Sequence, residues 1–329
     1  MRTESSASPS RLRPGAGGGV PFSFEVYPPR STARETALHE TIRHLAAAGP
    51  QFISVTFGAG GSSGGRSLDV LRFIRDETAI EPLAHITCVG NTYAAAAALI
   101  QEFLDAGILN FLALRGDPPE GAAEDDSFLG DLASAAELVQ LIDRVQATRA
   151  PYTEAGIPGL PGAAHVHRRE RAEIAVAAFP NGHPRSRHPN EHIDALLAKE
   201  AAGATLGITQ LFFHPDDYLC FVARSREAGV TIPILPGIMP ITSPARLRRV
   251  LELSGEALPS ELARALETEP TPEGQADVGV AHAAELVRAV VAEGAPGVHL
   301  YAFNNHDTVL AVLREAGILS PALQKEDAR

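Results

Sequence analysis

The chain has 329 residues, 45% of them hydrophobic, which is enough to fill a substantial core. Its formal net charge of −12 at pH 7 argues against a protein that binds nucleic acid or an anionic membrane surface, since either partner selects a basic face. No apolar run approaches the roughly 20 residues that span a bilayer, and two cysteines are too few for a disulfide framework.

The N-terminal residues 1–20 are rich in Arg, Ser, Pro and Gly and contain no apolar segment. This composition predicts a disordered tail rather than a signal peptide, and Glu4 argues against a transit peptide. We therefore expect a cytoplasmic protein. In that reducing compartment Cys88 and Cys220, each within an apolar segment, are predicted to be buried, inert thiols.

From residue 21 onward, short apolar runs alternate with helix-length segments that carry an apolar stripe. The runs are too short and too continuously hydrophobic for amphipathic helices, which predicts buried parallel strands. The predicted strands are 21–26, 51–56, 82–88, 110–115, 172–178, 206–212, 231–235 and 297–302. The predicted helices are 33–48, 67–77, 93–106, 131–149, 190–202, 216–228, 244–253 and 276–293.

Several predicted helices end in a glycine just before the next strand, at Gly49, Gly107, Gly203, Gly229 and Gly294. A glycine at this position adopts the left-handed conformation that ends a helix. Eight strand–helix units predict a closed (β/α)₈ TIM barrel over residues 21–320, followed by a short tail at 321–329. An open doubly wound sheet would need a Gly-rich turn after its first strand, where the chain instead has a Tyr-Pro-Pro sequence.

Two stretches interrupt the repeating pattern. Residues 148–171 are rich in Pro and Gly and then basic, which predicts a surface insertion at the N-terminal face of the barrel. Residues 255–274 are acidic and contain three prolines, and we expect them to add a helix before the last unit.

Polar residues stand at the C-terminal ends of the predicted strands, where the active site of a TIM barrel lies. They are Glu25, Thr56, His85, Thr87, Arg115, Asp117 and Gln210. Glu25 stands between Phe24 and Val26, so we expect burial to raise the pKa of its carboxyl group toward neutrality, as a general acid requires. A structural glutamate that pairs with an arginine is the alternative.

Two glycine-containing segments follow strands. Gly116, between Arg115 and Asp117, is expected to let the backbone approach a ligand closely, with Pro118 and Pro119 stiffening the loop. Residues 58–63 predict a flexible active-site loop but lack the pattern of a P-loop. Without cysteines or an HExxH helix beside them, a group of histidines is predicted to be solvated rather than metal-binding: His165, His167, His183, His188 and His192.

At these strand ends the sequence resembles the bacterial methylenetetrahydrofolate reductases. The matching segments occur in order and cover about residues 20–320. They are 22–29 (FSFEVYPP), 54–62 (SVTFGAGGS), 85–88 (HITC), 114–119 (LRGDPP), 177–180 (AAFP), 183–184 (HP), 208–213 (ITQLFF), 236–240 (PGIMP) and 299–301 (HLY). Any one of them is modest support, and together they are specific.

The resemblance implies a noncovalently bound FAD, reduced by NADH or NADPH, that passes a hydride to 5,10-methylenetetrahydrofolate and yields 5-methyltetrahydrofolate. A folate and a nicotinamide are therefore the expected partners, and relatives form homo-oligomers. Glu25 is implied as the proton donor, Asp117 as a neighbour of both pterin and flavin, and Gln210 as a hydrogen-bond partner of the pterin. The implied flavin site consists of Thr56, His85, Leu114, Arg115, Gly116, Asp117, Ala178, His183 and Lys199.

The sequence also departs from the family pattern. His214 replaces an Asp, His192 and Ala195 replace two polar flavin contacts, and Val250 replaces an aromatic residue that covers the ligand. Asn305 stands where the family has an arginine for the folate's glutamate tail, a charge-assisted contact of about 1.5–3 kcal/mol unless a cation such as Arg246 substitutes. These departures suggest a diverged paralogue with altered folate affinity or folate form.

Two alternatives stay open at the level of sequence. One is a barrel enzyme of one-carbon metabolism that acts on a pterin without a flavin. The other is a non-catalytic subunit that binds a folate, since one barrel fold hosts many unrelated functions.

Overall fold

The structure is a computed structural model that describes residues 19–29, 31, 34–57, 64–118, 128–149, 173–183, 186 and 188–319. All its strands pair in parallel in one sheet of order β7-β6-β5-β4-β3-β2-β1-β9-β8. The strands are β1 (Phe22–Val26), β2 (Phe52–Val55), β3 (Glu81–Thr87), β4 (Asn110–Leu114), β5 (Ile174–Ala178), β6 (Leu206–Thr209), β7 (Ile234–Leu235), β8 (Gly237–Ile238) and β9 (Val298–Tyr301).

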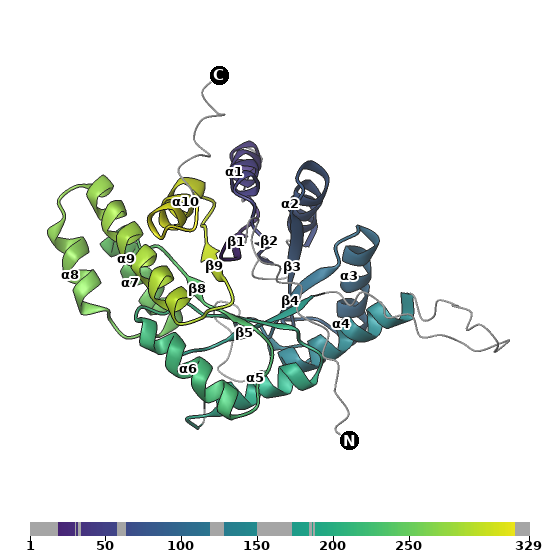
Figure 1. Cartoon of the computed structure of the whole chain (residues 1–329). Helices are drawn as coiled ribbons and strands as arrows, with labels where there is room; N and C mark the ends of the chain where they lie inside the picture. The colour runs from purple at the N-terminus through teal and green to yellow at the C-terminus, as the bar shows by residue number, and fades with distance from the viewer. Residues whose placement is uncertain are drawn as a thin grey trace, which may run out of the picture.

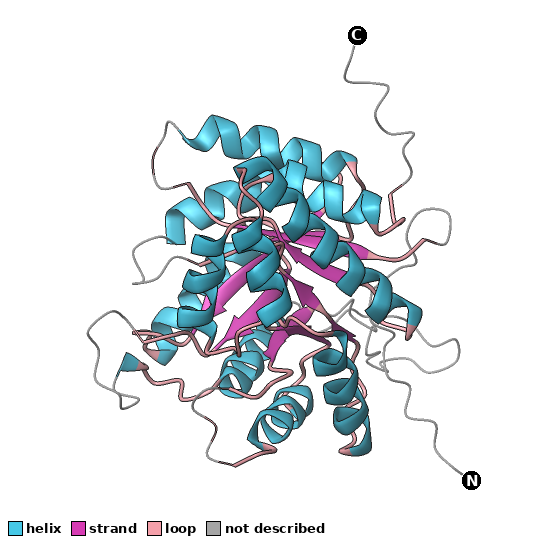
Figure 2. Ribbon diagram, turned by 90° about the vertical axis from the view of Figure 1, so that its left-hand side faces the viewer, coloured by secondary structure: helices cyan, strands magenta, loops and turns pink. Residues whose placement is uncertain are grey.

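The helices surround this sheet on the outside, as Figures 1 and 2 show. They are α1 (Glu35–Ala47), α2 (Gly64–Glu77), α3 (Tyr93–Asp105), α4 (Ala135–Arg149), α5 (Glu191–Ala201), α6 (Pro215–Glu227), α7 (Pro244–Ser254), α8 (Ser260–Thr268), α9 (Pro272–Ala292) and α10 (His306–Glu315). A parallel sheet wrapped by helices confirms the predicted TIM-barrel fold.

The barrel closes through the segment that contains β7 and β8. β7 pairs with β6, β8 pairs with β9, and Pro236 alone separates the two short strands. The sequence predicted one strand at 231–235 and eight strands in all, so this detail was wrong. Proline has no N–H to donate to a ladder, and it divides the strand into two pieces that hold opposite ends of the sheet.

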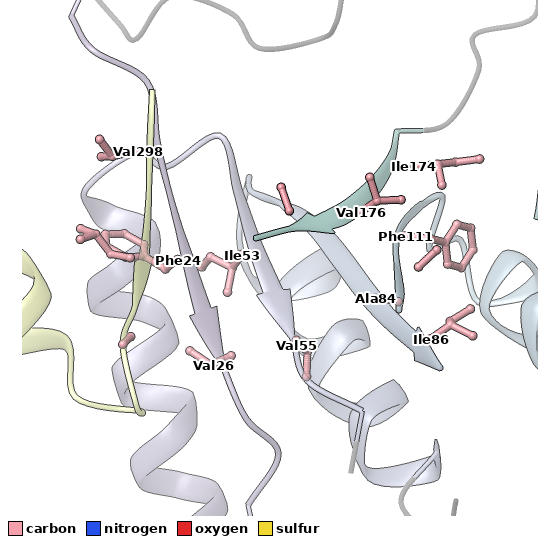
Figure 3. Close-up of a cluster of buried hydrophobic side chains, with 14 of the residues drawn as sticks. Phe24, Val26, Ile53, Val55, Ala84, Ile86, Phe111, Ile174, Val176 and Val298 are labelled. Carbon is pink, nitrogen blue, oxygen red and sulfur yellow. The ribbon is translucent and has the colours of Figure 1, made fainter. Parts of the chain in front are cut away.

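The strands carry two different sets of apolar side chains because successive residues of a strand point to opposite faces. One set packs against the surrounding helices and includes Phe24, Val26, Ile53 and Val55 (Figure 3). The other set fills the inside of the barrel and consists of Phe52, Leu83, Leu112, Ala175, Leu206, Ile208 and Leu235, with Leu114 packed against them. The continuous hydrophobicity of the predicted strands therefore reflects burial on both faces.

Helix boundaries follow the predicted glycine signals. Gly49, Gly107, Gly203, Gly229 and Gly294 all have positive φ angles, between 75° and 117°. The expected additional helix in 255–274 is α8, whereas α10 was missed. β6 ends at Thr209 rather than at 212, because Leu211 and Phe213 leave the sheet and pack against α7 and α8.

The two cysteines differ in exposure. Cys88 is buried, and burial raises the pKa of its thiol to about 12, as expected for an inert residue. Cys220 is exposed, which corrects the prediction. The buried residues of α6 are Tyr218, Phe221 and Ser225, so Cys220 lies on the other side of the helix.

Several predicted features lie outside the described residues. They are nearly all of the N-terminal tail, most of the insertion at 148–171, the loop at 58–63 and the C-terminal tail. In the part of the chain that the structure describes, no helix has both the length and the apolar character needed to cross a membrane.

Candidate active site

The predicted site residues gather at one end of the barrel because all the strands run in the same direction. Thr56, Gly116 and Gln210 each lie within two residues of the C-terminal end of a strand, while Glu25 and His85 lie inside β1 and β3. Lys199 comes from α5 and joins this end by donating from Nζ to the carbonyl oxygen of Ala177, at 2.8 Å. The tertiary structure therefore brings together residues that are far apart in the sequence.

Glu25 points into the barrel, since Phe24 and Val26 on either side of it pack outward. Its Oε2 lies 3.5 Å from Nε2 of His85 on β3 and 3.9 Å from Nε2 of His299 on β9. Both histidines are buried, and these two Nε2 atoms have no hydrogen-bond partner among the described residues. The carboxyl group thus lies between two imidazoles with open nitrogen positions.

The pKa of Glu25 is lowered rather than raised, which corrects the expectation from sequence. Burial by itself raises the pKa of this carboxyl group, but the neighbouring imidazoles of His299 and His85 outweigh burial. The prediction failed because it relied on the apolar neighbours in the chain. Those side chains face the helices, whereas the residues that face the carboxyl group come from other strands.

Ser23, His299 and Tyr301 complete this cluster and were not predicted as site residues. The hydroxyl of Ser23 donates to the carbonyl oxygen of Val298 at 3.5 Å, and it lies 2.8 Å from Nδ1 of His299. Tyr301, the register partner of Glu25, donates from its hydroxyl to the carbonyl oxygen of Thr209 at 2.7 Å. Burial and the nearby Glu25 raise the pKa of Tyr301 well above its usual value.

A sequence signal for these residues does exist. Polar residues occur at a spacing of two within otherwise apolar strands, Ser23 with Glu25 on β1 and His299 with Tyr301 on β9. This spacing places each pair on one face of its strand, and here that face is the inside of the barrel.

The buried histidine predicts a pH dependence of stability. Burial, opposed by Glu25 and reinforced by His299, lowers the pKa of His85 to about 4. The unfolded chain binds a proton at this residue below about pH 6.5, while the folded protein binds one only near pH 4. The free energy of unfolding should therefore fall by up to about 3 kcal/mol as the pH falls through this window.

Urea unfolding at several pH values checks this prediction with two variants. His85→Gln should flatten the dependence between pH 6.5 and 4. His188→Gln, which changes an exposed histidine, should leave it unchanged. An equal slope in His85→Gln and the unaltered protein would show that His85 does not carry the effect.

The end of β4 is held by tight packing. Gly116 has φ +87°, and an added Cβ would lie 2.5 Å from Cγ2 of Val89. Contact with the chain itself therefore suffices to require the glycine, and its close approach to a ligand stays a prediction. Next to it, the guanidinium of Arg115 lies over the ring of Phe128, 5.4 Å from its centre, while Asp117 is exposed.

The remaining predicted residues surround the mouth of the barrel. The backbone N–H of Thr56 donates to Val26, and that of Gln210 donates to Ala178. The carboxamide of Gln210 accepts from the N–H of Leu211 at 2.9 Å. The ring of His183 lies edge-on to Phe179, with ring centres 4.9 Å apart.

Lys199 is a partly buried cation at this end. Burial lowers the pKa of its ammonium group to about 8. Its Nζ lies 5.8 Å from the centre of the Phe179 ring, in addition to its bond to Ala177. A cation in such surroundings favours an anionic ligand.

The departures from the family pattern have local structural roles. His192 is buried with both ring nitrogens unpaired among the described residues, and its ring stacks on Phe221, which corrects its prediction as a solvated histidine. Val250, on α7, packs in an apolar cluster with Leu247 of the same helix and with Leu262 and Leu266 of α8. Asn305 caps α10, because its side chain accepts from the N–H of Thr308 at 3.2 Å. His214 stands at the start of α6, where its backbone N–H donates to the side chain of Asp217.

No group of three or more metal-binding side chains occurs within the described ranges, which do not include His165 or His167. A cavity of about 350 Å³ lies beside His183, away from the Glu25 cluster. It is lined by Asn181, Gly182, His183, Phe213, His214, Asp217, Ser254, Gly255, Glu256 and Ala257.

Comparison with known proteins gives consistent results. The family model described as methylenetetrahydrofolate reductase matches residues 13–317. A probable methylenetetrahydrofolate reductase (NADH) of Oryza sativa subsp. japonica is 31% identical over 314 residues, which cover 92% of this chain and 49% of that protein. The 5,10-methylenetetrahydrofolate reductase of Escherichia coli K12 is 27% identical, with 92% of each chain covered.

The chain thus spans about half the length of the plant relatives it matches and nearly all of the bacterial one. Among solved structures, an uncharacterized protein from Clostridium thermocellum superimposes with a TM-score of 0.58 at 12% identity, covering 91% of this chain and 94% of that one. That protein binds two copies of 5-methyl-5,6,7,8-tetrahydrofolic acid. At this identity the likeness supports the fold alone.

Proposed function

The chain belongs to the methylenetetrahydrofolate reductase family, and on this premise we propose that it reduces 5,10-methylenetetrahydrofolate to 5-methyltetrahydrofolate with NADH or NADPH through noncovalent FAD. The observation that supports this most is a partly buried carboxyl group between two imidazoles at the end of the barrel where catalysis takes place. Such a cluster supplies a proton inside a largely apolar barrel, which reductive opening of a folate ring requires.

The residues present fit a flavin dinucleotide. Lys199 is an enclosed cation whose Nζ bonds to a neutral carbonyl oxygen, and Arg115 contributes a second cation to the same end. We propose that these two residues hold the phosphates or ribityl oxygens, with Thr56, His85, Leu114, Gly116, Ala178 and His183 lining the site. When bound, FAD would accept a hydride from the nicotinamide and deliver it to the folate.

We propose that Glu25 and His299 act as a proton-donating pair, whose Oε2 and Nε2 atoms approach from their present separation of 3.9 Å to hydrogen-bond distance when the proton is exchanged. With the hydroxyl of Ser23 donating to Val298 at 3.5 Å, we propose that it accepts a bond from Nδ1–H of His299 at 2.8 Å, so that Nε2 of the imidazole faces Glu25. A proton on Nε2 makes an imidazolium–carboxylate pair, which agrees with the lowered pKa of Glu25. The same proton on Glu25 is available for transfer to the folate, which leaves Glu25 ionised and His299 neutral until the pair takes up another proton from water.

Donation of this proton to a bridging nitrogen of 5,10-methylenetetrahydrofolate breaks one carbon–nitrogen bond and leaves an iminium ion, which then accepts the hydride. Asp117, exposed at the end of β4, would lie beside the pterin and the flavin. Gln210 would hydrogen-bond the pterin once its carboxamide turns away from the N–H of Leu211.

A spectrum of the purified protein tests this function. A yellow protein that bleaches with NADH or NADPH without oxygen, and recovers its colour with 5,10-methylenetetrahydrofolate, is the expected result. A colourless protein that stays inert with added FAD would favour a flavin-free enzyme or a folate-binding subunit instead. Bleaching without recovery would mean that another substrate oxidises the flavin.

Lys199→Met should have opposite effects on folding and on cofactor binding. At pH 7 the ammonium is charged in both folded and unfolded chains, so the burial cost is present in full and its removal should stabilise the flavin-stripped protein by about 1–2 kcal/mol. FAD binding should weaken about 10- to 100-fold. Urea unfolding and a fluorescence titration with FAD measure the two effects.

The control is Lys199→Arg, which keeps the charge and should keep most of the affinity for FAD. Weakened binding of FAD in Lys199→Arg equal to that in Lys199→Met would indicate a purely structural role for the lysine. Unchanged binding in Lys199→Met would remove Lys199 from the proposed site.

A further inference from the structure

Ser54 is a polar residue inside the barrel that the proposed mechanism does not use. It lies on β2 and is fully buried, and its Oγ has no hydrogen-bond partner among the described residues. Ile53 and Val55 on either side of it pack outward against the helices, so its side chain points into the barrel (Figure 3). Buried hydroxyl groups are nearly always hydrogen-bonded, and an unpaired one calls for an explanation.

The position of Ser54 makes it the neighbour of Glu25 on the next strand. The two are register partners in β1 and β2, both point into the barrel, and neighbouring strands lie about 4.8 Å apart. His85 of β3 reaches Glu25 across β2, with its Nε2 3.5 Å from Oε2 of the carboxyl group. The small side chain of Ser54 leaves room for this contact and presents a hydroxyl beside it.

Unpaired buried atoms gather around this carboxyl group. Of the six such side-chain atoms in the described part of the chain, three belong to Ser54, His85 and His299. The titratable groups that face Glu25 are His85 from β3 and His299 and Tyr301 from β9. From β2 the carboxyl group faces the neutral hydroxyl of Ser54.

The proposed proton transfer changes what the carboxyl group requires. Before transfer, an imidazolium of His299 balances the charge of the carboxylate. After transfer to the folate, Glu25 is ionised and His299 is neutral, so a carboxylate in a largely apolar barrel has lost its cation. A hydrogen-bond donor stabilises such a charge. A serine hydroxyl supplies one by turning about its Cα–Cβ bond, without movement of the backbone.

We propose, resting on the function proposed above, that Ser54 is a positioning residue whose hydroxyl donates a hydrogen bond to the carboxylate of Glu25 once the proton has been delivered. This bond makes the proton-donating pair a stronger acid, because it stabilises only the state that has lost the proton. Alanine at this position would avoid burying an unpaired hydroxyl, so the reaction accounts for the serine better than folding does.

Ser54→Ala tests the inference through the pH dependence of flavin reoxidation by 5,10-methylenetetrahydrofolate. Loss of a hydrogen bond to an ionised group should raise the pH at which the pair loses its proton by about 1–2 pH units. Below that midpoint, reoxidation should slow about 10-fold, because a weaker acid transfers its proton more slowly. Flavin reduction by the nicotinamide should keep its rate. Stopped-flow absorbance over a series of pH values measures both steps.

Two further variants serve as controls. Ser225→Ala makes the same change at another buried serine whose hydroxyl is unpaired among the described residues, on α6 outside the barrel strands, and should leave the pH dependence unchanged. Ser54→Thr keeps a hydroxyl and should keep the normal midpoint. Urea unfolding should show Ser54→Ala to be at least as stable as the unaltered protein, since the variant removes an unpaired buried group.

Three kinetic outcomes would overturn this inference. The first is an active Ser54→Ala with an unchanged midpoint and an unchanged rate of reoxidation. The second is a raised KM for the folate or weaker binding of FAD with an unchanged midpoint, which would assign the hydroxyl to a bound ligand. The third is an equal change in Ser225→Ala, which would show that the effect is not specific to the neighbour of Glu25.

A measurement without folate separates this inference from the proposed function. Nitrogen-15 NMR of histidine-labelled protein, with the signal of His299 assigned through His299→Gln, follows the same proton as the pH rises. The pair should lose it at a higher pH in Ser54→Ala. If folates prove not to be substrates, the proposed function fails while this shift still occurs. An unchanged titration would refute the role of Ser54, whatever the substrate.

Discussion

Replacing Glu25 with glutamine should slow reduction of 5,10-methylenetetrahydrofolate by about 100- to 10,000-fold, the range that a general acid contributes. Glutamine has nearly the same shape but carries no acidic proton, so the ring of the folate would open without assistance. Reduction of FAD by the nicotinamide needs no such proton and should continue at a similar rate. Stopped-flow absorbance, which follows flavin reduction and flavin reoxidation separately, measures the two steps.

Glu81→Gln is the matched control. Glu81 lies at the start of β3, at the opposite end of the barrel, and accepts a hydrogen bond from the side chain of Asn110 at 3.3 Å. This variant should leave both steps unchanged. Reoxidation by the folate at the normal rate in Glu25→Gln would contradict the role proposed for Glu25, whereas slowing of both steps would indicate a disturbed site.

The ability of Glu25 to donate a proton depends on the residues around it. A carboxyl group whose pKa is lowered is a weak donor by itself at neutral pH. The proposed sharing of one proton with His299 resolves this, because the pair presents a proton even when Glu25 is ionised in the resting protein.

Replacing Gly237 with alanine should destabilise the folded protein by about 3 kcal/mol or more. An added Cβ would lie 2.1 Å from the carbonyl oxygen of Thr209 and 2.7 Å from the hydroxyl of Tyr301. The N–H of Gly237 donates to Oγ1 of Thr209 at 2.8 Å, and Tyr301 donates to the carbonyl oxygen of the same threonine. The new methyl group would force β6, β8 and β9 apart where the barrel closes.

Gly207→Ala, in the neighbouring strand β6, serves as the control. Its added Cβ would lie 3.5 Å from the nearest atom, Cγ1 of Ile234, which is ordinary contact. The change should be close to neutral, since alanine also lowers the entropy of the unfolded chain. Urea unfolding compares the two variants, and equal free energies of unfolding would show that the closure is not strained by a methyl group at 237.

Much of the architecture could be predicted from local sequence signals. Apolar runs of strand length and glycines at helix ends depend on only a few neighbouring residues, and both occur as expected. The errors also have local causes. Pro236 divides a strand whose hydrophobicity is continuous, and Cys220 lies on the outer side of a helix whose apolar stripe was drawn too broadly.

The candidate site was only partly predictable. Parallel strands place their C-terminal ends together, so the position of Glu25, His85 and Arg115 at one mouth followed from the fold class. The partners of Glu25 did not follow. Ser23 and His299 are 276 residues apart in the chain and 2.8 Å apart in space, between Ser23 Oγ and His299 Nδ1.

The sequence by itself determined the barrel, the end at which its chemistry lies and the family to which the resemblance pointed. Only the tertiary structure decided the electrostatics. Residues next to each other in a strand face opposite sides, so the environment of Glu25 comes from β3 and β9 rather than from Phe24 and Val26. For the same reason the pKa of Glu25 is lowered only after the sheet has closed.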